Sequence, residues 1–540
     1  MANNYSSHFN TKKTPQSQPV PGKKQVQNNA GGFVFQLDKW GQLNRFLILG
    51  SEGTSFYVSE KKLTVENAEN TIECINEDGV RVVNTLVDIS LNGRAPKNDS
   101  AIFVLALVTA FGNEASKKAA YDAITKVCRI GTHLFQFVEA VQALRGWSNG
   151  LRKGVAKFYT QNSIDTVAMN LIKYRNRSGF THRDVLRLAH PSANNPQLND
   201  VLRWAAAKKP ESLHKTLEGF EKIQALTAKD ENEAVKLITT YGLPREALPT
   251  ELLNSVKVWD ALNTNMPMTA TIRNLGKMTN VGLLKSNLDA NTKLIVQRLT
   301  NVDQIKKSRV HPIAILNALS VYKKGHGDKG SLTWTPVTAV MDALDEAFYL
   351  AFGNVDSTNK NHLLALDCSG SMFGANIAGT GLTAAEAAGA MAMVTLKSEP
   401  YTETVFFSSG GSMAGSGRGI ARLDLSKKKR LDDVLKTMQG APWGGTDCAL
   451  PMQYAKANKL DVDTFVIYTD NETWAGGQHP FQALKEYRQH ASKQDAKLIV
   501  VATSASAFTI ADPSDRGMLD VVGFDTATPN VMAEFTKGNL

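Results

Sequence analysis

Apolar side chains recur every three or four positions through most of residues 33–352, which is the spacing of one helix face. The pattern is clearest over residues 118–127, 167–174 and 313–322, and the continuous apolar run 101–111 suits a buried helix. Turn-forming clusters interrupt it at residues 93–96, 191–196 and 324–327. Helix pairs joined by short turns over roughly 300 residues predict an α-solenoid, with degenerate repeats of the HEAT kind.

Beyond residue 360 the pattern changes to short apolar runs separated by helical segments. The runs are 362–366 (HLLAL), 404–407 (TVFF), 464–468 (TFVIY) and 497–502 (KLIVVA), and helical periodicity covers 384–396 and 481–489. Strands that alternate with helices predict a parallel sheet, and their nearly continuous apolarity fits burial on both faces. The C-terminal part is therefore predicted to be a doubly wound α/β domain.

The chain has 540 residues, 42% of them apolar, which is enough for two or more hydrophobic cores. We expect a disordered tail over residues 1–30, which are polar and lack an apolar run, then a helical domain (31–360) and the α/β domain (361–540). The longest apolar run falls far short of the ~20 residues that span a bilayer. Without a secretory leader as well, the chain is expected to be cytoplasmic, with no membrane association.

The net charge of +10 is unevenly distributed. The first 366 residues hold 45 basic and 32 acidic side chains, a net +13, whereas the rest hold 16 and 19, a net −3. A basic body favours a polyanionic partner, although a solvated lysine-rich surface explains the charge equally well. The four cysteines, which form no C-x-x-C pair, are predicted to be reduced thiols: Cys74, Cys128, Cys368 and Cys448.

Three loops of the α/β domain carry hydroxyl and carboxylate groups, where doubly wound sheets bind their ligands. HLLAL runs into a D-x-S-x-S sequence (367–371), TFVIY runs into TDNE (469–472), and a third loop contains GGTD (444–447). Such oxygen donors suit a hard cation, above all Mg²⁺. We predict the metal-ion-dependent adhesion site of von Willebrand A domains, with hydroxyl ligands Ser369, Ser371 and Thr446 and water-mediated or indirect binding by Asp367 and Asp470.

Each loop also has a simpler explanation. Asp and Ser cap helices and turns after strands, so only the three loops together favour the metal site. Cys368 and Cys448 lie beside two of the loops and are interpreted as buried small hydrophobes. The sequence has no second metal cluster, G-x-S-x-G or phosphate loop, so we predict a non-enzymatic protein. The glycine-rich segment 408–419 is predicted to be a flexible loop after a strand.

Seven stretches, in the expected order, resemble the Ro ribonucleoprotein (TROVE-domain) family. They are NRFLILGSEGTSFYVSEKKLTVENAE (44–69), CRIGTHLF (128–135), KYRNRSGFTHRDVLRLAH (173–190), MPMTATIRNLGKMT (266–279), GGTDCALPM (444–452), TDNETWAGGQHP (469–480) and FTIADPSDRGMLDVVGFDT (508–526). The chain departs from animal members in its Asn/Gln-rich N-terminus, in segment 408–419 and at Gly370, a non-ligand position of the metal loop.

The resemblance implies a toroidal ring of HEAT-like repeats closed by a von Willebrand A-like domain. It also implies RNA quality control or scaffolding of RNA decay, with Y-like small noncoding RNA on a basic outer surface and single-stranded ends of misfolded RNA in a central hole. An exoribonuclease is a candidate partner, and we expect a monomer. The family's RNA contacts fall on Lys173, Arg177 and His190, and second-rank candidates are Arg129, His133, Arg273 and Lys277.

Basic groups at adjoining helix ends can converge on a phosphate, with Tyr174 or Phe180 available for stacking and Thr181 as a helix cap. The same groups could simply stabilise a helix C-terminus. Two other functions compete with RNA binding: a metal-dependent module for an acidic protein ligand, and a metal-dependent nuclease. The positive charge outside the metal domain disfavours the module, and a single-ion site disfavours the nuclease.

Overall fold

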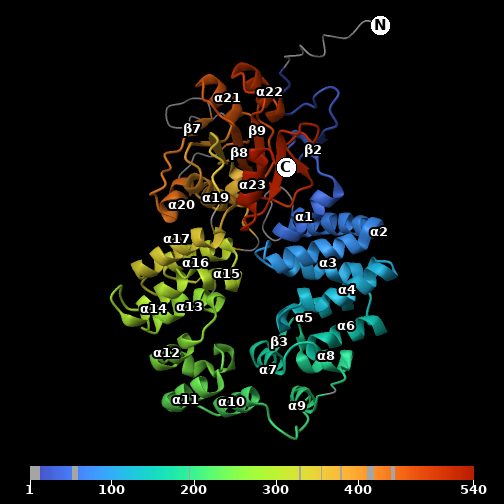
Figure 1. Ribbon diagram of the computed structural model, residues 1–540, viewed down its shortest axis with the longest axis vertical. Coiled ribbons are helices and arrows are strands. Elements are labelled where there is room, and N and C mark those ends of the chain that lie inside the picture. Colours follow the sequence, from blue (N-terminus) through green and yellow to red (C-terminus); the bar gives the residue numbers. More distant parts are fainter. Residues whose placement is uncertain are drawn as a thin grey trace. The chain divides into compact units, whose positions relative to one another are not determined.

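The computed structural model describes residues 13–51, 59–193, 195–327, 330–353, 355–377, 380–409, 419–439 and 444–540. The chain forms two compact units (Figure 1). Residues 66–353 form the helical unit, and residues 1–65 and 354–540 together form the α/β unit. None of the described helices is both long and apolar enough to cross a membrane.

The helical unit consists almost entirely of α-helices, as predicted, and α2 has a break at Asp78. Its helices are α2 (Glu60–Asn92), α3 (Asp99–Phe111), α4 (Glu114–Val127), α5 (Gly131–Leu144), α6 (Asn149–Thr160), α7 (Ile164–Lys173), α8 (His182–Ala189), α9 (Pro196–Ala205), α10 (Lys215–Gln224), α11 (Glu231–Tyr241), α12 (Val256–Thr264), α13 (Met268–Asn280), α14 (Ala290–Leu299), α15 (Val302–Ser308), α16 (Pro312–Lys324) and α17 (Thr338–Phe352). Shorter elements are β3 (Asn176–Arg177), β4 (Phe180–Thr181), η2 (Ala228–Asp230), η3 (Arg245–Ala247) and η4 (Thr250–Asn254).

The end of α2, the first helix of this unit, contacts the segment between α15 and α16 near the end of the unit. Arg309, after α15, donates from Nη1 to the carbonyl of Leu91 near the end of α2, over 2.7 Å. His311, the N-cap of α16, lies 3.3 Å through Nε2 from the carbonyl of Arg94. Because 217 or more residues separate these partners, the helical unit closes on itself and is not an open solenoid. This finding agrees with the predicted ring of helices.

Local sequence explains how α7 and α8 are placed. Ser163 accepts from the backbone N–H of Thr166 at the start of α7. The β3–β4 hairpin then leads into α8, where Thr181 and Asp184 form a reciprocal capping box. This confirms the prediction that Thr181 caps the helix. α8 ends at His190, whose φ of 45° is left-handed. The turn before Pro191 therefore ends α8 where the sequence predicted.

The α/β unit contains all four predicted strands. Its elements are β1 (Val26–Gln27), β2 (Phe33–Gln36), α1 (Lys39–Leu49), β5 (His362–Asp367), α18 (Gly370–Gly374), α19 (Ala384–Ser398), β6 (Thr402–Phe407), β7 (Ile420–Arg422), α20 (Leu431–Gln439), α21 (Leu450–Ala457), β8 (Thr464–Thr469), α22 (Pro480–His490), β9 (Lys497–Ala502), β10 (Phe508–Thr509), β11 (Met518–Val522) and α23 (Thr528–Lys537).

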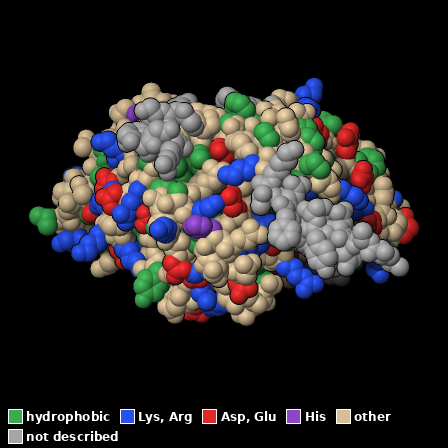
Figure 2. All heavy atoms as spheres, turned by 90° about the horizontal axis from the view of Figure 1, so that it is seen from above, with side chains coloured by type: hydrophobic (Ala, Val, Ile, Leu, Met, Phe, Trp, Pro, Cys, Tyr) green, Lys and Arg blue, Asp and Glu red, His purple; other side chains and the backbone are tan. Residues whose placement is uncertain are grey.

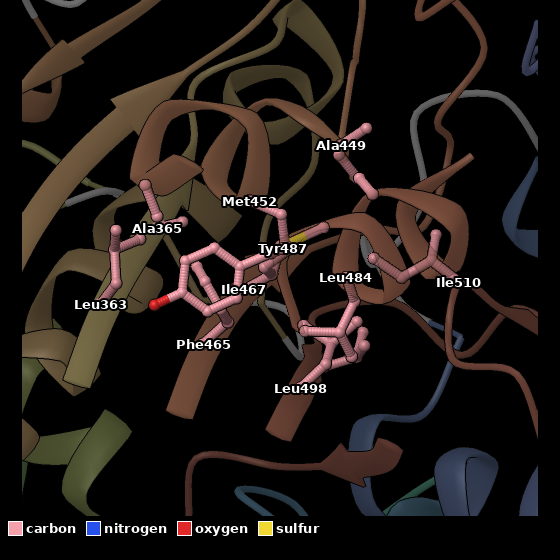
Figure 3. Close-up of a cluster of buried hydrophobic side chains, with 14 of the residues drawn as sticks. Leu363, Ala365, Ala449, Met452, Phe465, Ile467, Leu484, Tyr487, Leu498 and Ile510 are labelled. Carbon is pink, nitrogen blue, oxygen red and sulfur yellow. The ribbon is translucent and has the colours of Figure 1, made fainter. Parts of the chain in front are cut away.

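The main sheet has the strand order β11-β9-β8-β5-β6-β7, and every neighbouring pair except β6–β7 is parallel. On one face, Leu363 and Phe465 pack with Met452 of α21 and Tyr487 of α22 in a buried cluster (Figure 3). On the other face, α19 contacts β5 and β8. The helices thus cover both faces, as the apolar strands predicted.

The predicted disordered tail is wrong for residues 13–30, and residues 1–12 lie outside the described part. β2 pairs with β10, and β1 pairs with β2, so the N-terminal segment adds a second small sheet to the α/β unit. α1 is anchored by buried Arg45, which donates to the carbonyls of Ser506 and Phe508. Residues 31–51, which the sequence analysis placed in the helical domain, pack with the α/β unit, so the compact units do not divide at residue 31.

Candidate functional site

The predicted metal ligands converge at the carboxyl ends of two adjacent parallel strands. β5 ends at Asp367 and β8 ends at Thr469, and the two strands pair directly. Ser369 Oγ lies 3.2 Å from Ser371 Oγ, and the backbone N–H of Ser369 donates to Asp367 Oδ1 over 2.9 Å. The third loop joins them, because the N–H of Gly370 donates to the carbonyl of Gly444.

All five predicted ligands are buried: Asp367, Ser369, Ser371, Thr446 and Asp470. Burial, and next the nearby charge of Asp470, raise the pKa of Asp367 to about 7. Burial also raises the pKa of Asp470, although a hydrogen bond from Ser371 acts in the opposite direction. Neither carboxylate has an ion-pair partner among the described residues. Two buried carboxyl groups in this position therefore lack a compensating positive charge.

The donor set fits a hard cation. Thr446 Oγ1 is buried and has no hydrogen-bond partner within the described part of the chain, so this oxygen is available to an ion. Nowhere in the described ranges do three or more His, Cys, Asp or Glu side chains gather in a way that could hold a metal. An ion at these loops would thus depend on the hydroxyl groups, and such a set suits Mg²⁺ better than a soft metal.

Thr469 is a site residue that the sequence analysis missed. Its Oγ1 donates to Asp367 Oδ2 over 2.6 Å and accepts from the N–H of Asn471 over 3.2 Å. This one hydroxyl therefore fixes the D-x-S-x-S loop against the loop after β8. A hydroxyl residue immediately before Asp470 was the available signal, but threonine is also a common strand residue.

The N-terminal segment contacts these loops, which the sequence analysis also missed. Buried Gln16 donates to Asp447 Oδ1 over 2.7 Å, and Asn28 donates to the carbonyl of Thr473 over 2.8 Å. Asn29 and the N–H of Ala30 bind the carboxylate of Glu472. Burial, and next the charge of Asp470, raise the pKa of Glu472 to about 7. Asn and Gln in a polar segment gave no local signal of this role.

The neighbouring cysteines behave as predicted. Cys368 and Cys448 are buried and form no disulfide, and burial raises the pKa of both thiols. Of the predicted flexible loop, residues 410–418 lie outside the described part.

The first-rank RNA candidates lie around the β3–β4 hairpin and α8. Lys173 ends α7, and its Nζ lies 5.6 Å from the ring centre of Tyr174. Arg177 is exposed in β3, and His190 is exposed at the end of α8. From the helical rise, α8 places the hairpin and His190 roughly 12 Å apart. These residues therefore border one short helix, and whether they contact RNA stays a prediction.

Two further arginines of α8 were missed by the sequence analysis. Arg183 and Arg187 are exposed, and with His190 they follow the i, i+4, i+7 spacing of one helix face. Neither arginine has an ion-pair partner in the described part of the helical unit. We call Arg183, Arg187 and His190 the α8 basic face. The amphipathic pattern of α8 was the available signal.

Arg129 and His133 have structural contacts. Arg129 donates from Nη1 to the carbonyl and the hydroxyl of Ser90, each over 2.9 Å, near the end of α2. Burial, and next the charge of Arg129, lower the pKa of His133 to about 4. These positions therefore suit the junction of α2 with α5 better than a solvent-facing contact with phosphate.

Arg273 and Lys277 lie on α13. Arg273 is exposed and close enough to Tyr174 to lower the pKa of its phenol, which burial raises. Lys277 donates from Nζ to Asn254 Oδ1 over 2.9 Å. Arg273 thus approaches the end of α7, where Lys173 lies, although about 100 residues separate the two in sequence.

Charge is concentrated in one part of the helical unit. Between Lys126 and Lys215 the sequence has 15 basic and 5 acidic residues, and this stretch includes α8. By contrast, Figure 2 shows a face on which basic and acidic side chains are interspersed. The stretch around α8 is therefore the strongest candidate for a polyanion.

Comparisons with known proteins agree with these two units. The family described as TROVE domain matches residues 26–241 and 242–321, and the family described as Ro60 vWA domain matches residues 361–536. The chain is 41% identical over 524 residues to RNA-binding protein RO60 of Deinococcus radiodurans, covering 96% of each chain. It is 37% identical over 609 residues to RNA-binding protein RO60 of Caenorhabditis elegans, covering 98% of this chain and 92% of the relative. The crystal structure of Deinococcus radiodurans RO (RSR) protein matches with a TM-score of 0.70 and 40% identity, covering 93% of this chain and all of that one.

Proposed function

Because this chain belongs to the Ro family of RNA-binding proteins, we propose that its helical unit binds structured small noncoding RNA through the α8 basic face. The observation that carries the proposal is the exposure of Arg183 and Arg187 on one side of α8 without an ion-pair partner among the described residues. An unpaired guanidinium can bind phosphate oxygens through two parallel hydrogen bonds. Lys173 and Arg177 extend this surface along the hairpin.

The RNA is proposed to be of the Y-like class, held by its backbone on this surface. Single-stranded ends of misfolded noncoding RNA are the second proposed ligand, and an exoribonuclease is a proposed partner that would degrade them. In this account the protein binds and presents RNA and has no catalytic step of its own. Affinity then comes mainly from phosphate neutralisation and depends strongly on salt.

We further propose that the α/β unit holds one Mg²⁺ through Ser369, Ser371 and Thr446, with Asp367 and Asp470 positioning its water ligands. The partnerless hydroxyl of Thr446 and the two uncompensated carboxyl groups support this ion. When bound, the ion supplies positive charge and an open coordination position. A second candidate function is that an acidic side chain of a protein partner binds the ion at this open coordination position.

Crosslinking in cells tests the RNA proposal directly. The full-length protein is irradiated in cells, and both the crosslinked RNA and the crosslinked peptides are sequenced. We expect small structured RNAs, attached to peptides from residues 173–190. Crosslinking by the double variant Arg183→Ala/Arg187→Ala should fall sharply. Recovery of no RNA above background would leave the metal-dependent protein module as the better account.

A further inference from the structure

A cavity of about 220 Å³ lies in the helical unit where α7, η3, α12 and α13 meet. Its wall is mainly apolar and includes Met169, Leu243 and Leu262. The polar side chains at the wall include Lys173, Glu246 and Asn274. A mainly apolar pocket with a few polar groups is the usual form of a site for a small molecule.

The polar groups of this cavity have spare hydrogen-bonding capacity. Asn274 is more than nine-tenths buried, and its Nδ2 donates to the carbonyl of Ala270 over 2.8 Å. Its Oδ1 has no recorded partner in the described part of the unit, and Glu246 has no recorded ion pair there. The amide oxygen of Asn274 is a hydrogen-bond acceptor only, and so are the two oxygens of an ionised Glu246 carboxylate.

The cavity shares one residue, Lys173, with the proposed RNA surface. Tyr174, the next residue, lies close enough to Arg273 and Glu246 for both charges to act on its phenol. Lys173 and Arg273 thus place positive charge near the cavity, as a phosphate group requires. If the protein binds RNA as proposed above, a part of that RNA is the ligand that fits this cavity.

We propose that this cavity takes one unstacked nucleobase of the bound RNA and prefers a base with an exocyclic amino group. The apolar wall contacts the faces of the base, while Lys173 lies on the side of its phosphate. The amino group of cytosine donates to the carboxylate of Glu246, and Asn274 Oδ1 is a second acceptor beside it. Uracil places a carbonyl oxygen where cytosine has that amino group, so it faces the carboxylate with lone pairs and loses the hydrogen bond.

Oligocytidylate and oligouridylate are the matched probes, because the two bases have the same size. Affinities of eight-nucleotide oligomers for the full-length protein are measured by fluorescence anisotropy over a salt series. We expect oligocytidylate to bind about fivefold more tightly at each salt concentration, with equal slopes of log affinity against log salt. Glu246→Gln, which keeps the volume and removes the charge, should reduce the ratio.

The variant Ala270→Leu fills the cavity without removing a charge. It should bring the ratio close to one and leave the salt slope unchanged, whereas Ala115→Leu on the exposed surface of α4 should change neither. Thermal melting shows whether each variant is folded. If Ala270→Leu does not fold, the oligocytidylate-to-oligouridylate affinity ratio of Glu246→Gln alone tests the proposal. An unchanged ratio in folded variants, or a ratio near one in the wild type with intact salt-dependent binding, overturns the cavity proposal. Absence of salt-dependent binding to either oligomer would instead overturn the RNA function itself.

Discussion

The side-chain amide of Gln16 donates to Asp447 Oδ1 over 2.7 Å, although 431 residues separate the two in sequence. Gln16 is fully buried, and it also accepts from Thr473 Oγ1 and donates to the carbonyl of Gln478. Asp447 follows the proposed ligand Thr446, and Thr473 follows the loop of Asp470. The N-terminal segment therefore links two loops of the candidate metal centre.

Gln16→Ala should destabilise the α/β unit by about 2 kcal/mol, because buried Asp447 and Thr473 each lose one hydrogen bond. Chemical denaturation, followed by a probe of the α/β unit, measures the change. Gln18→Ala is the matched control, since the side chain of Gln18 is exposed. Equal stabilities for the two variants would show that the N-terminal segment does not support these loops.

Thr446→Val and Thr469→Val should have opposite effects. Thr446 Oγ1 is buried without a partner, so replacing the hydroxyl by a methyl group should leave the metal-free protein as stable or slightly more stable. It should abolish the stabilisation by Mg²⁺. Thr469→Val should destabilise the metal-free protein by about 1 to 3 kcal/mol, because Asp367 loses a buried hydrogen bond. Calorimetry with and without Mg²⁺ distinguishes them, and unaltered Mg²⁺ stabilisation in Thr446→Val would remove Thr446 from the site.

His311 should make the closure of the helical unit sensitive to acid. Its Nδ1 accepts from the N–H of Ile313 over 3.1 Å, so the neutral ring carries its proton on Nε2, which faces the carbonyl of Arg94. Burial lowers the pKa of His311 to about 4, below the ~6.5 of an unfolded chain. The unfolded state therefore binds more protons between these values, and stability falls as the pH drops below about 6.5.

The expected loss from His311 between pH 8 and pH 5 is about 2 kcal/mol. His311→Asn retains an N-cap acceptor without a titrating ring, so its stability should depend less on pH over this interval. Denaturation at several pH values compares the two proteins. Identical pH profiles would mean that protonation of His311 does not oppose closure.

The sequence predicted the elements whose residues carry a periodic signal. The apolar runs of β5, β6, β8 and β9 appear as strands, and the D-x-S-x-S sequence lies at the end of β5 as expected. By contrast, the role of the N-terminal segment depends on contacts across more than 400 residues, such as that of Gln16 with Asp447. Local periodicity cannot predict such a contact, because the segment itself buries few apolar side chains.

The basic residues illustrate the same limit. Arg129 and Arg183 are equally basic in sequence, yet the structure places Arg129 against Ser90 and leaves Arg183 exposed. Only the packing of α2 against the segment before α5 separates a structural arginine from one that is available to a ligand. The resemblance to the Ro family pointed to Lys173, Arg177 and His190 but not to Arg183 and Arg187, whose exposure is a finding of the structure.

The most direct test of the central claim is the salt dependence of RNA binding by Arg183→Ala/Arg187→Ala. Its control is Lys306→Ala/Lys307→Ala, which removes the same charge from exposed positions of α15. Filter binding measures the affinity for a structured small RNA with a single-stranded 3′ tail over a salt series. If the α8 basic face neutralises two phosphates, the slope of log affinity against log salt should flatten by about 1.5 in the α8 variant and remain unchanged in the control. Equal slopes in the wild type and the α8 variant, or equal losses in both variants, would contradict RNA binding through α8.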